Sequence, residues 1–252
     1  MSFDPYCGPA PLPANLWSTW NLDPVLLVLL AGLGLVVWTR PAIPRNQRLV
    51  QSAGVLVLAI AFVSPLCALS TALFLARILH HLLLVAAAAP LLVGLLPARL
   101  RAAGAWPTAA FVVHMAVLWA WHAPGPYGWA LKGVLPYWIM ELTLIASALW
   151  LWLAIARSGS AGGIALLLAT VVQMGMLGAL LTFAPRPLFE PHLLTTIPFG
   201  LSPLQDQQLA GLLMWVPAAL PYVAVALLRV AGALSPSGTS TSSGEGAAWS
   251  RG

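Results

Sequence analysis

Long apolar runs separated by short polar stretches dominate the pattern of this chain. Seven runs approach or reach the length of a bilayer-spanning helix, and they cover residues 25–38, 49–66, 73–96, 109–122, 137–156, 164–183 and 209–230. A helix needs about 20 residues to cross the hydrocarbon, where its backbone polar groups must be satisfied internally. The first and fourth runs are short by this measure. The pattern predicts an all-α fold, a polytopic membrane bundle of seven transmembrane helices.

Three stretches lie outside these runs or interrupt them. Residues 1–24 form a proline-rich tail, and residues 231–252 are rich in serine and glycine, a composition typical of disorder. The polar loop before the last apolar run carries prolines at 185, 187, 191, 198 and 203, which restrict its backbone. We therefore expect a tail at 1–24, one membrane domain at 25–230, a disordered tail at 231–252 and a rigid, function-bearing loop near residues 184–208.

Composition and charge agree with a membrane protein and give it an orientation. Of the 252 residues, 60% are hydrophobic and only 7% are charged, whereas about a quarter of a soluble domain is charged. The net charge of +5 does not indicate nucleic-acid binding, because most basic residues lie in alternate loops: Arg40, Arg45, Arg48, Arg99, Arg101, Arg157 and Arg229. The positive-inside rule places these loops in the cytoplasm. It predicts an extracytoplasmic N-terminus and a cytoplasmic C-terminus.

The two cysteines, Cys7 and Cys67, both fall on the outer side in this topology. There they could form a disulfide, bind a soft metal ion or remain unpaired thiols. Two cysteines alone do not choose between these alternatives.

Ionisable side chains are rare within the apolar runs, and six stand out: Arg77, His80, His81, His114, His122 and Glu141. Such groups are costly in a bilayer, usually face the bundle interior and mark functional sites. The alternative is that they only bind neighbouring helices, with Glu141 paired to Arg77.

A count of depth suggests a metal site. At about 1.5 Å per residue, His80, His81 and His114 lie roughly 10 Å below the outer ends of their helices. Met176 and Met214 fall near that level, with Glu141 a little shallower. Because imidazole and thioether ligands suit Cu(I), we take as candidate copper ligands His80, His81, His114, His122, Met176 and Met214. Against this, methionine is often only packing, and the five helices need not turn these faces toward one another.

A second group of polar residues lies near the outer surface. Its candidate functional members are Glu141, Arg186, His192, Asp206 and Gln207. They could receive a metal ion from outside. Alternatively, Arg186, Glu190 and Asp206 pair with one another and only order the loop.

Four stretches of the chain resemble a known family. They are SPLCALSTALFLARILHHLLLVAAAAPLL (64–92), WHAPGPYGWAL (121–131), GALLTFAPRPLF (178–189) and GLSPLQDQQLAGLLMWVP (200–217). These are similar to the multi-span cytochrome c oxidase assembly factors of the CtaG type, and the resemblance covers roughly residues 50–230. It implies a bacterial plasma (inner) membrane protein that helps mature a haem–copper oxidase by supporting copper insertion. The implied partners are oxidase subunits and a periplasmic copper donor, with no nucleic acid.

The resemblance transfers unevenly to individual residues. Positions that match the family are His81, His122, Pro185, Arg186, Pro187, Asp206, Gln207 and Trp215. The family often has histidine where this chain has Arg77, and histidines beside the acid of the fifth run where it has Trp138 and Leu142. Either His80 and His114 compensate, or metal binding here is weaker or absent.

Three functions compete at this point. The leading one is a non-enzymatic assembly factor that receives copper at His122, His192 or Asp206 and holds it near His81. The second is a membrane oxidoreductase whose b-type haem is ligated by His80 or His81 together with His114. The third is a metal-free scaffold for oxidase subunits. We expect no hydrolase, because the sequence has no Ser/His/Asp arrangement and no HExxH motif.

Overall fold

The computed structural model describes residues 5–41, 43–102 and 106–234, and this part of the chain is helical without strands. Most of the predicted disordered tail, from residue 235 on, lies outside the described residues. The elements, in chain order, are η1 (Leu16–Ser18), α1 (Pro24–Thr39), α2 (Arg45–Val63), α3 (Pro65–Ala72), α4 (Phe74–Leu82), the π-helical η2 (Leu83–Ala88), α5 (Ala89–Leu92), η3 (Val93–Leu95), α6 (Ala98–Ala102), α7 (Pro107–Trp121), α8 (Pro124–Ala130), α9 (Val134–Arg157), α10 (Ser160–Phe183), η4 (Glu190–His192), η5 (Ile197–Phe199), α11 (Pro203–Trp215) and α12 (Ala219–Leu234).

Five helical segments of the described chain are long and apolar enough to cross a membrane. They are Arg45–Val63, Phe74–Leu95, Val134–Arg157, Ser160–Phe183 and Pro203–Leu234. The other two predicted spans correspond to α1 and α7, which are apolar but only 16 and 15 residues long. The all-helical membrane architecture is therefore as predicted, and the two short runs are also the two short helices.

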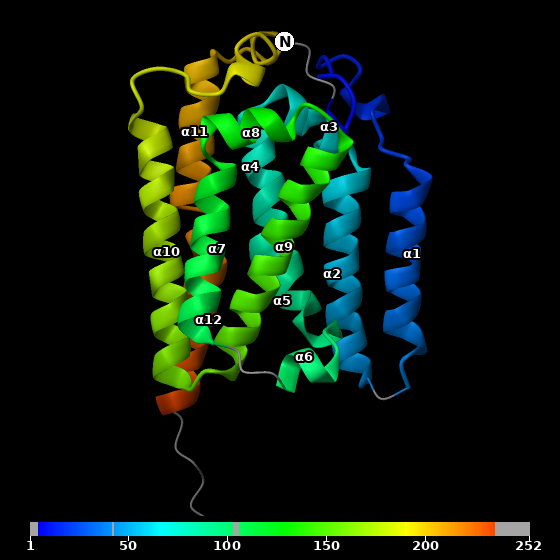
Figure 1. Cartoon of the computed structure of the whole chain (residues 1–252), viewed down its shortest axis with the longest axis vertical. Coiled ribbons are helices and arrows are strands. Elements are labelled where there is room, and N and C mark those ends of the chain that lie inside the picture. Colours follow the sequence, from blue (N-terminus) through cyan, green and yellow to red (C-terminus); the bar gives the residue numbers. More distant parts are fainter. Residues whose placement is uncertain (1–4, 42, 103–105, 235–252) are drawn as a thin grey trace, which may run out of the picture.

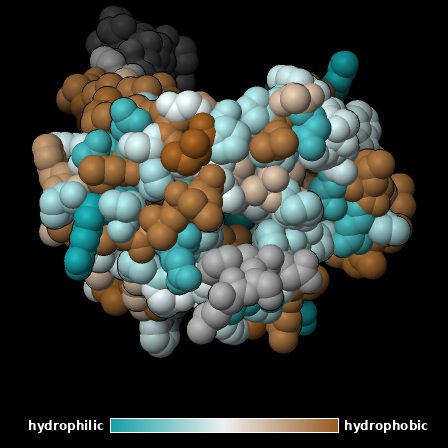
Figure 2. All heavy atoms as spheres, turned by 90° about the horizontal axis from the view of Figure 1, so that it is seen from above, coloured by the Kyte–Doolittle hydropathy of each residue, from teal (hydrophilic) through white to brown (hydrophobic). Residues whose placement is uncertain are grey.

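The helices stand side by side as a bundle with two distinct ends (Figure 1). The short helices α3 and α8 and the loop at 184–202 cover one end, here called the cap end, while α6 lies at the opposite end. Seen from above, polar and apolar residues mix on the end face, and hydrophobic residues predominate around its rim (Figure 2). Large apolar side chains such as Leu29, Val172 and Leu228 are more than 60% exposed. Such a surface is suited to contact with lipid chains.

The third span is irregular along its length. Leu73 has an extended backbone (φ −121°, ψ 129°), which separates α3 from α4. Further along, the π-helical turn Leu83–Ala88 precedes Pro90, whose ring cannot follow a regular α-helical turn without clashing with the carbonyl four residues earlier. The Val85 carbonyl accepts a hydrogen bond from the indole of Trp152 (2.8 Å). π-Helical turns inside α-helices are frequent at functional sites.

The last span is broken as well, which the sequence pattern did not predict. Helix α11 ends at Trp215 and α12 begins at Ala219, with Pro217 between them. Proline has no amide hydrogen and therefore interrupts the helical hydrogen-bond ladder. The two pieces together still occupy the predicted segment 209–230.

Helices α10 and α11 pack closely because small residues meet at their crossing. A Cβ atom on Gly178 would lie 2.8 Å from the carbonyl oxygen of Gly211, and one on Gly211 would lie 2.6 Å from that of Gly178. Such approaches are possible only for glycine. Contact between small residues is the usual way in which membrane helices come close.

Candidate functional site

A cluster of charged and aromatic nitrogen-bearing side chains is buried below the cap end of the bundle. Arg77, His80 and His81 project from α4, and Glu141 projects from α9; each is at most 1% exposed. Positions three and four apart share one helical face, so Arg77 and both histidines can reach the same carboxylate. We call these four residues, together with His122, the polar cluster.

One carboxylate oxygen is the centre of the polar cluster. Glu141 Oε1 lies 3.2 Å from Arg77 Nη1, 3.5 Å from His80 Nε2 and 3.7 Å from His81 Nε2. The pairing of Glu141 with Arg77, left open by the sequence, is therefore present. Because the two charges cancel, the carboxylate is not an uncompensated anion in the membrane.

His122 joins this group from the end of α7. Its ring faces that of His81 edge-on, with 5.4 Å between the ring centroids and 80° between the planes. His122 Nδ1 lies 2.6 Å from the Leu118 carbonyl oxygen. A carbonyl can only accept, so the proton is on Nδ1 and Nε2 keeps its lone pair. Metal-binding histidines are commonly oriented by a hydrogen bond of this kind on the other ring nitrogen.

Most polar atoms of the cluster lack a hydrogen-bond partner. Among the described residues these include both ring nitrogens of His80 and of His81, His122 Nε2, Glu141 Oε2, and Arg77 Nε and Nη2. In folded proteins about 90% or more of buried polar groups are paired, and an unpaired one costs about 1–3 kcal/mol. His80 Nε2 and His81 Nε2 still lie at ion-pair distance from Glu141 Oε1, so the cluster is a layer of polar atoms whose contacts are mainly electrostatic.

The polar cluster is not a preformed chelate. No group of three or more His, Cys, Asp or Glu side chains in the described ranges has a geometry that could hold a metal ion. A metal ion would therefore be held by one or two imidazoles, or by more after side-chain rotation. Arg77 further limits strong chelation, since its guanidinium occupies Glu141 Oε1 and stacks over the Tyr137 ring at 5.4 Å.

Asp206 is not a member of the polar cluster but holds the helix that carries most of it. This side chain of α11 accepts hydrogen bonds from the backbone amides of Phe74 (2.7 Å) and Leu75 (3.1 Å). These are the first amides of α4, and Leu73 at the N-cap has no side-chain oxygen to bind them. A carboxylate is a favoured partner for unpaired amides at a helix start, so Asp206 fixes the helix that carries Arg77, His80 and His81.

His192 is likewise a structural group. Its Nδ1 lies 3.2 Å from the Ala72 carbonyl oxygen, and its Nε2 lies 2.6 Å from the Tyr127 hydroxyl. Nδ1–H therefore donates to the carbonyl, while Nε2 accepts from the tyrosine. Burial lowers the pKa of His192 to about 3. Both ring nitrogens of His192 thus have protein partners, and its role as an outer copper receptor stays a prediction.

The remaining outer-loop candidates divide into a buried and an exposed set. Gln207 is buried; its carbonyl accepts from the Leu188 amide (2.7 Å) and its amide donates to the Leu181 carbonyl (3.2 Å). Arg186 and Glu190 are exposed. Among the described residues no ion pair joins Arg186, Glu190 and Asp206 to one another, so the suggested pairing does not order the loop.

Three predicted copper ligands do not join the polar cluster. His114 Nδ1 bonds to Ser147 Oγ (3.0 Å) on α9. Met176 is 57% exposed and lines an outward-facing groove with Phe183 and Pro185. Met214 is buried in the apolar core. Depth along a helix does not determine which way a side chain faces, and that is why the expected five-helix layer reduces to residues of α4, α7 and α9.

Two tyrosines near the cluster were missed by the sequence reasoning. Tyr127 bonds His192, and Tyr137 packs under the Arg77 guanidinium. Tyr137 could have been found, because it precedes Glu141 by four residues and must share its helical face. Nothing in the sequence near Tyr127 points to its distant partner.

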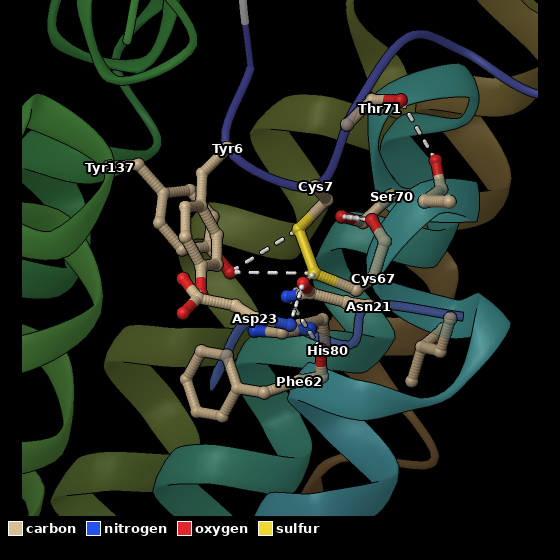
Figure 3. The surroundings of a disulfide bond; sticks show 12 residues. Tyr6, Cys7, Asn21, Asp23, Phe62, Cys67, Ser70, Thr71, His80 and Tyr137 are labelled. Atoms are coloured by element: carbon tan, nitrogen blue, oxygen red, sulfur yellow. Dashed lines mark hydrogen bonds between the residues drawn. A yellow bond between two sulfur atoms is a disulfide. The ribbon is translucent and has the colours of Figure 1, made fainter. Parts of the chain in front are cut away.

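The two cysteines form a disulfide, Cys7–Cys67, with 5.4 Å between their Cα atoms. This decides among the three alternatives that the sequence left open. The bond joins the N-terminal segment to α3 and lies beside Tyr137 (Figure 3). On the same side, Tyr6 donates to Asp23 (2.6 Å) and stacks on Tyr137 at a centroid distance of 4.9 Å. Within the described part of the predicted tail (5–24), Tyr6, Cys7 and Asp23 therefore hold the segment against the cap end.

Comparison with known proteins gives one result. No curated protein and no solved structure matches the chain significantly. The family model described as cytochrome c oxidase caa3 assembly factor (Caa3_CtaG) matches residues 27–234. That range contains the whole polar cluster, Asp206 and His192. The match spans most of the 252 residues, so the chain belongs to the family of cytochrome c oxidase caa3 assembly factors.

Proposed function

We propose that this chain is a non-enzymatic membrane assembly factor that supports delivery of copper to a haem–copper cytochrome c oxidase. Membership of the assembly-factor family supports the process. The observation that supports copper is the layer of unpaired imidazole nitrogens on His80, His81 and His122. Imidazole suits copper, as it suits zinc, iron and nickel, and the nearest partner of His80 Nε2 and His81 Nε2 is Glu141 Oε1 at 3.5 and 3.7 Å.

The electrostatics of the cluster suit a passing monovalent ion. Arg77 and Glu141 already neutralise each other at 3.2 Å, so Cu(I) would bring only its own single charge into the layer. Two imidazoles from different helices, such as His81 and His122, form a site that can open by rotation of one side chain. We expect such a site to hold copper briefly and release it to a partner, which is what a carrier requires.

The disulfide and the arginines support the orientation that the sequence predicts. Disulfides persist in oxidising compartments outside the cytoplasm, which favours an outward-facing cap end. Arg40 and Arg229 act at the other end, where they bind the carbonyl oxygens of Leu95 and of Ile155 and Ser158. We therefore propose a seven-span topology in a bacterial plasma membrane, with the N-terminus outside. The short helices α1 and α7, about 24 and 22 Å long at 1.5 Å per residue, would complete it.

A groove on the side of the bundle offers a route for transfer within the membrane. Glu141 borders a cavity of about 160 Å³ that is otherwise lined by apolar residues of α1, α2 and α9, among them Leu29 and Leu142. Both leucines are more than half exposed, so the groove opens toward the lipid. This supports handing copper to an oxidase subunit docked beside the bundle, after its receipt from a periplasmic donor.

The test is the copper content and visible spectrum of the detergent-purified protein after anaerobic loading with Cu(I). We expect about one histidine-bound copper per chain, lost in His81→Ala and retained in Met176→Leu, which changes an exposed predicted ligand. A Soret band would instead identify a haem protein. Neither copper nor haem would leave a scaffold whose buried histidines are structural.

A further inference from the structure

The Cys7–Cys67 disulfide separates the outer surface from the buried histidines. Cys67 on α3 is fully buried. Cys7 lines a surface cavity of about 190 Å³, together with Pro9, Asn15 and Thr19. One sulfur therefore borders a space open to the outside, and the other belongs to the interior of the cap end.

Two short paths of contact connect the sulfurs to the polar cluster. The Tyr137 hydroxyl lies 3.5 Å from Cys7 Sγ and 4.0 Å from Cys67 Sγ. The same tyrosine ring lies under Arg77, which pairs with Glu141. A single residue thus touches both the disulfide and the charged pair of the cluster.

The second path leads to a histidine. Asn21 Nδ2 lies 3.8 Å from Cys67 Sγ and donates to the Phe62 carbonyl at 3.1 Å. The Phe62 ring packs edge-on against the imidazole of His80, with 4.9 Å between centroids. Figure 3 shows His80 and Phe62 on the inner side of the disulfide. His80 has no hydrogen-bond partner on either ring nitrogen.

We propose that Cys7 and Cys67, when reduced, form a Cu(I) uptake site that lies between the outer cavity and the histidines of the polar cluster. This inference rests on the proposed copper function and extends it with a defined point of admission. Soft thiolate ligands select Cu(I), and the two Cα atoms are 5.4 Å apart, so both sulfurs can approach one ion. In the oxidised protein the two sulfurs bind each other and cannot bind copper.

The chemistry balances with one external reductant. A dithiol protein of the thioredoxin class on the outer side attacks the disulfide, and thiol–disulfide exchange transfers two electrons and two protons. Its own dithiol becomes a disulfide, while Cys7 and Cys67 become thiols. Binding of Cu(I) then displaces both thiol protons and leaves a bis-thiolate complex of net charge −1.

Cys7 also lies outside the residues that match the family model, which begin at 27. The uptake site is thus formed between a segment upstream of the family match and Cys67 within it. This makes it an addition to the region shared with the family and not a part of that region alone.

The test compares copper uptake by the oxidised and the reduced full-length protein. The disulfide is reduced, the reductant is removed anaerobically, and Cu(I) is offered from its bicinchoninate complex. We expect reduced protein to bind one more copper than oxidised protein, with a near-ultraviolet thiolate-to-Cu(I) charge-transfer band. Cys7→Ser/Cys67→Ser should lose the additional copper, whereas Ser70→Ala, on the same helix as Cys67, should keep it.

Two further experiments separate copper binding by the thiols from misfolding of a variant and from copper binding by the histidines. Alkylation of the thiols in reduced wild-type protein should remove the additional copper without any substitution. His81→Ala should lose the copper of the oxidised form and keep the additional copper of the reduced form. Equal copper in oxidised and reduced wild-type protein would overturn the uptake site. Copper in the reduced form only, with none in the oxidised wild type, would support the dithiol site and count against the histidine site alone.

Discussion

Asp206 on α11 holds the start of α4 by accepting the backbone amide of Phe74 at 2.7 Å, across 132 residues of sequence. The same carboxylate accepts the Leu75 amide at 3.1 Å. One side chain therefore connects the last membrane segment to the helix that carries Arg77, His80 and His81. The position of the polar cluster depends on this contact, although Asp206 does not touch the cluster.

Replacement of Asp206 by alanine should destabilise the protein and displace α4. Loss of a helix cap costs about 0.5–2 kcal/mol, and the amides of Phe74 and Leu75 would remain buried without partners. The apparent melting temperature in detergent should fall, and Cu(I) binding should weaken with it. Asp206→Asn, which keeps one acceptor oxygen, should lie between alanine and wild type. Exposed Glu190→Gln is the control, and a fall as large as that of Asp206→Ala would contradict this interpretation.

The pairing of Arg77 with Glu141 predicts strong non-additivity. Glu141→Gln alone leaves a guanidinium buried without its counter-charge, which costs about 3–5 kcal/mol in comparable pairs. Arg77→Met alone leaves the carboxylate with only the two histidines. The double variant Arg77→Met/Glu141→Gln removes both charges and should recover most of the stability. Thermal unfolding of the four proteins measures the coupling, and simple additivity of the two single changes would argue against the pair.

His192 predicts a dependence of stability on pH. Burial lowers its pKa from 6.5 to about 3, so the unfolded chain binds a proton that the folded chain does not. The contribution of neutral His192 is complete above its unfolded pKa and is lost as the pH falls toward its folded pKa. The apparent melting temperature should therefore decrease from about pH 7 to about pH 5.

The matched variant for this effect is His192→Gln. Glutamine keeps a hydrogen-bonding amide at this position but does not titrate, so the decrease with pH should become smaller. Hydrogen exchange of residues 189–201 should show where the acid effect arises, since His192 and Thr195 both bind the Ala72 carbonyl. Identical pH profiles for the variant and the wild type would assign the effect to another group.

The contact between α10 and α11 predicts a steric effect at Gly211. A methyl group there would lie 2.6 Å from the Gly178 carbonyl oxygen, so Gly211→Ala must push the helices apart and lower stability. Gly232→Ala is the control, because nothing lies within 4 Å of its added methyl group. Alanine is the better helix former by about 1 kcal/mol, so that variant should be at least as stable as wild type. Thermal unfolding compares the two, and equal effects would contradict the close packing.

Hydrophobic patterning alone determined the class of this protein and the helices on which its polar groups lie. Few charged residues and apolar runs of about 20 residues indicate a bundle of membrane helices, because a helix satisfies its backbone polar groups within the segment. Local spacing also placed Arg77, His80 and His81 on one face. These features depend on the spacing of residues along the chain, which the sequence gives directly.

The tertiary structure decided which of these groups meet. Met176 and Met214 were equivalent by depth, yet one faces outward and the other is buried in the core, because the rotation of each helix is set by its packing. His192 and Asp206 looked like outer metal receptors, but distant partners on α3, α8 and α4 use their polar atoms. The disulfide also required two segments separated by 60 residues to come together. Contacts across such separations depend on the packing of the whole bundle, and a local sequence pattern does not contain them.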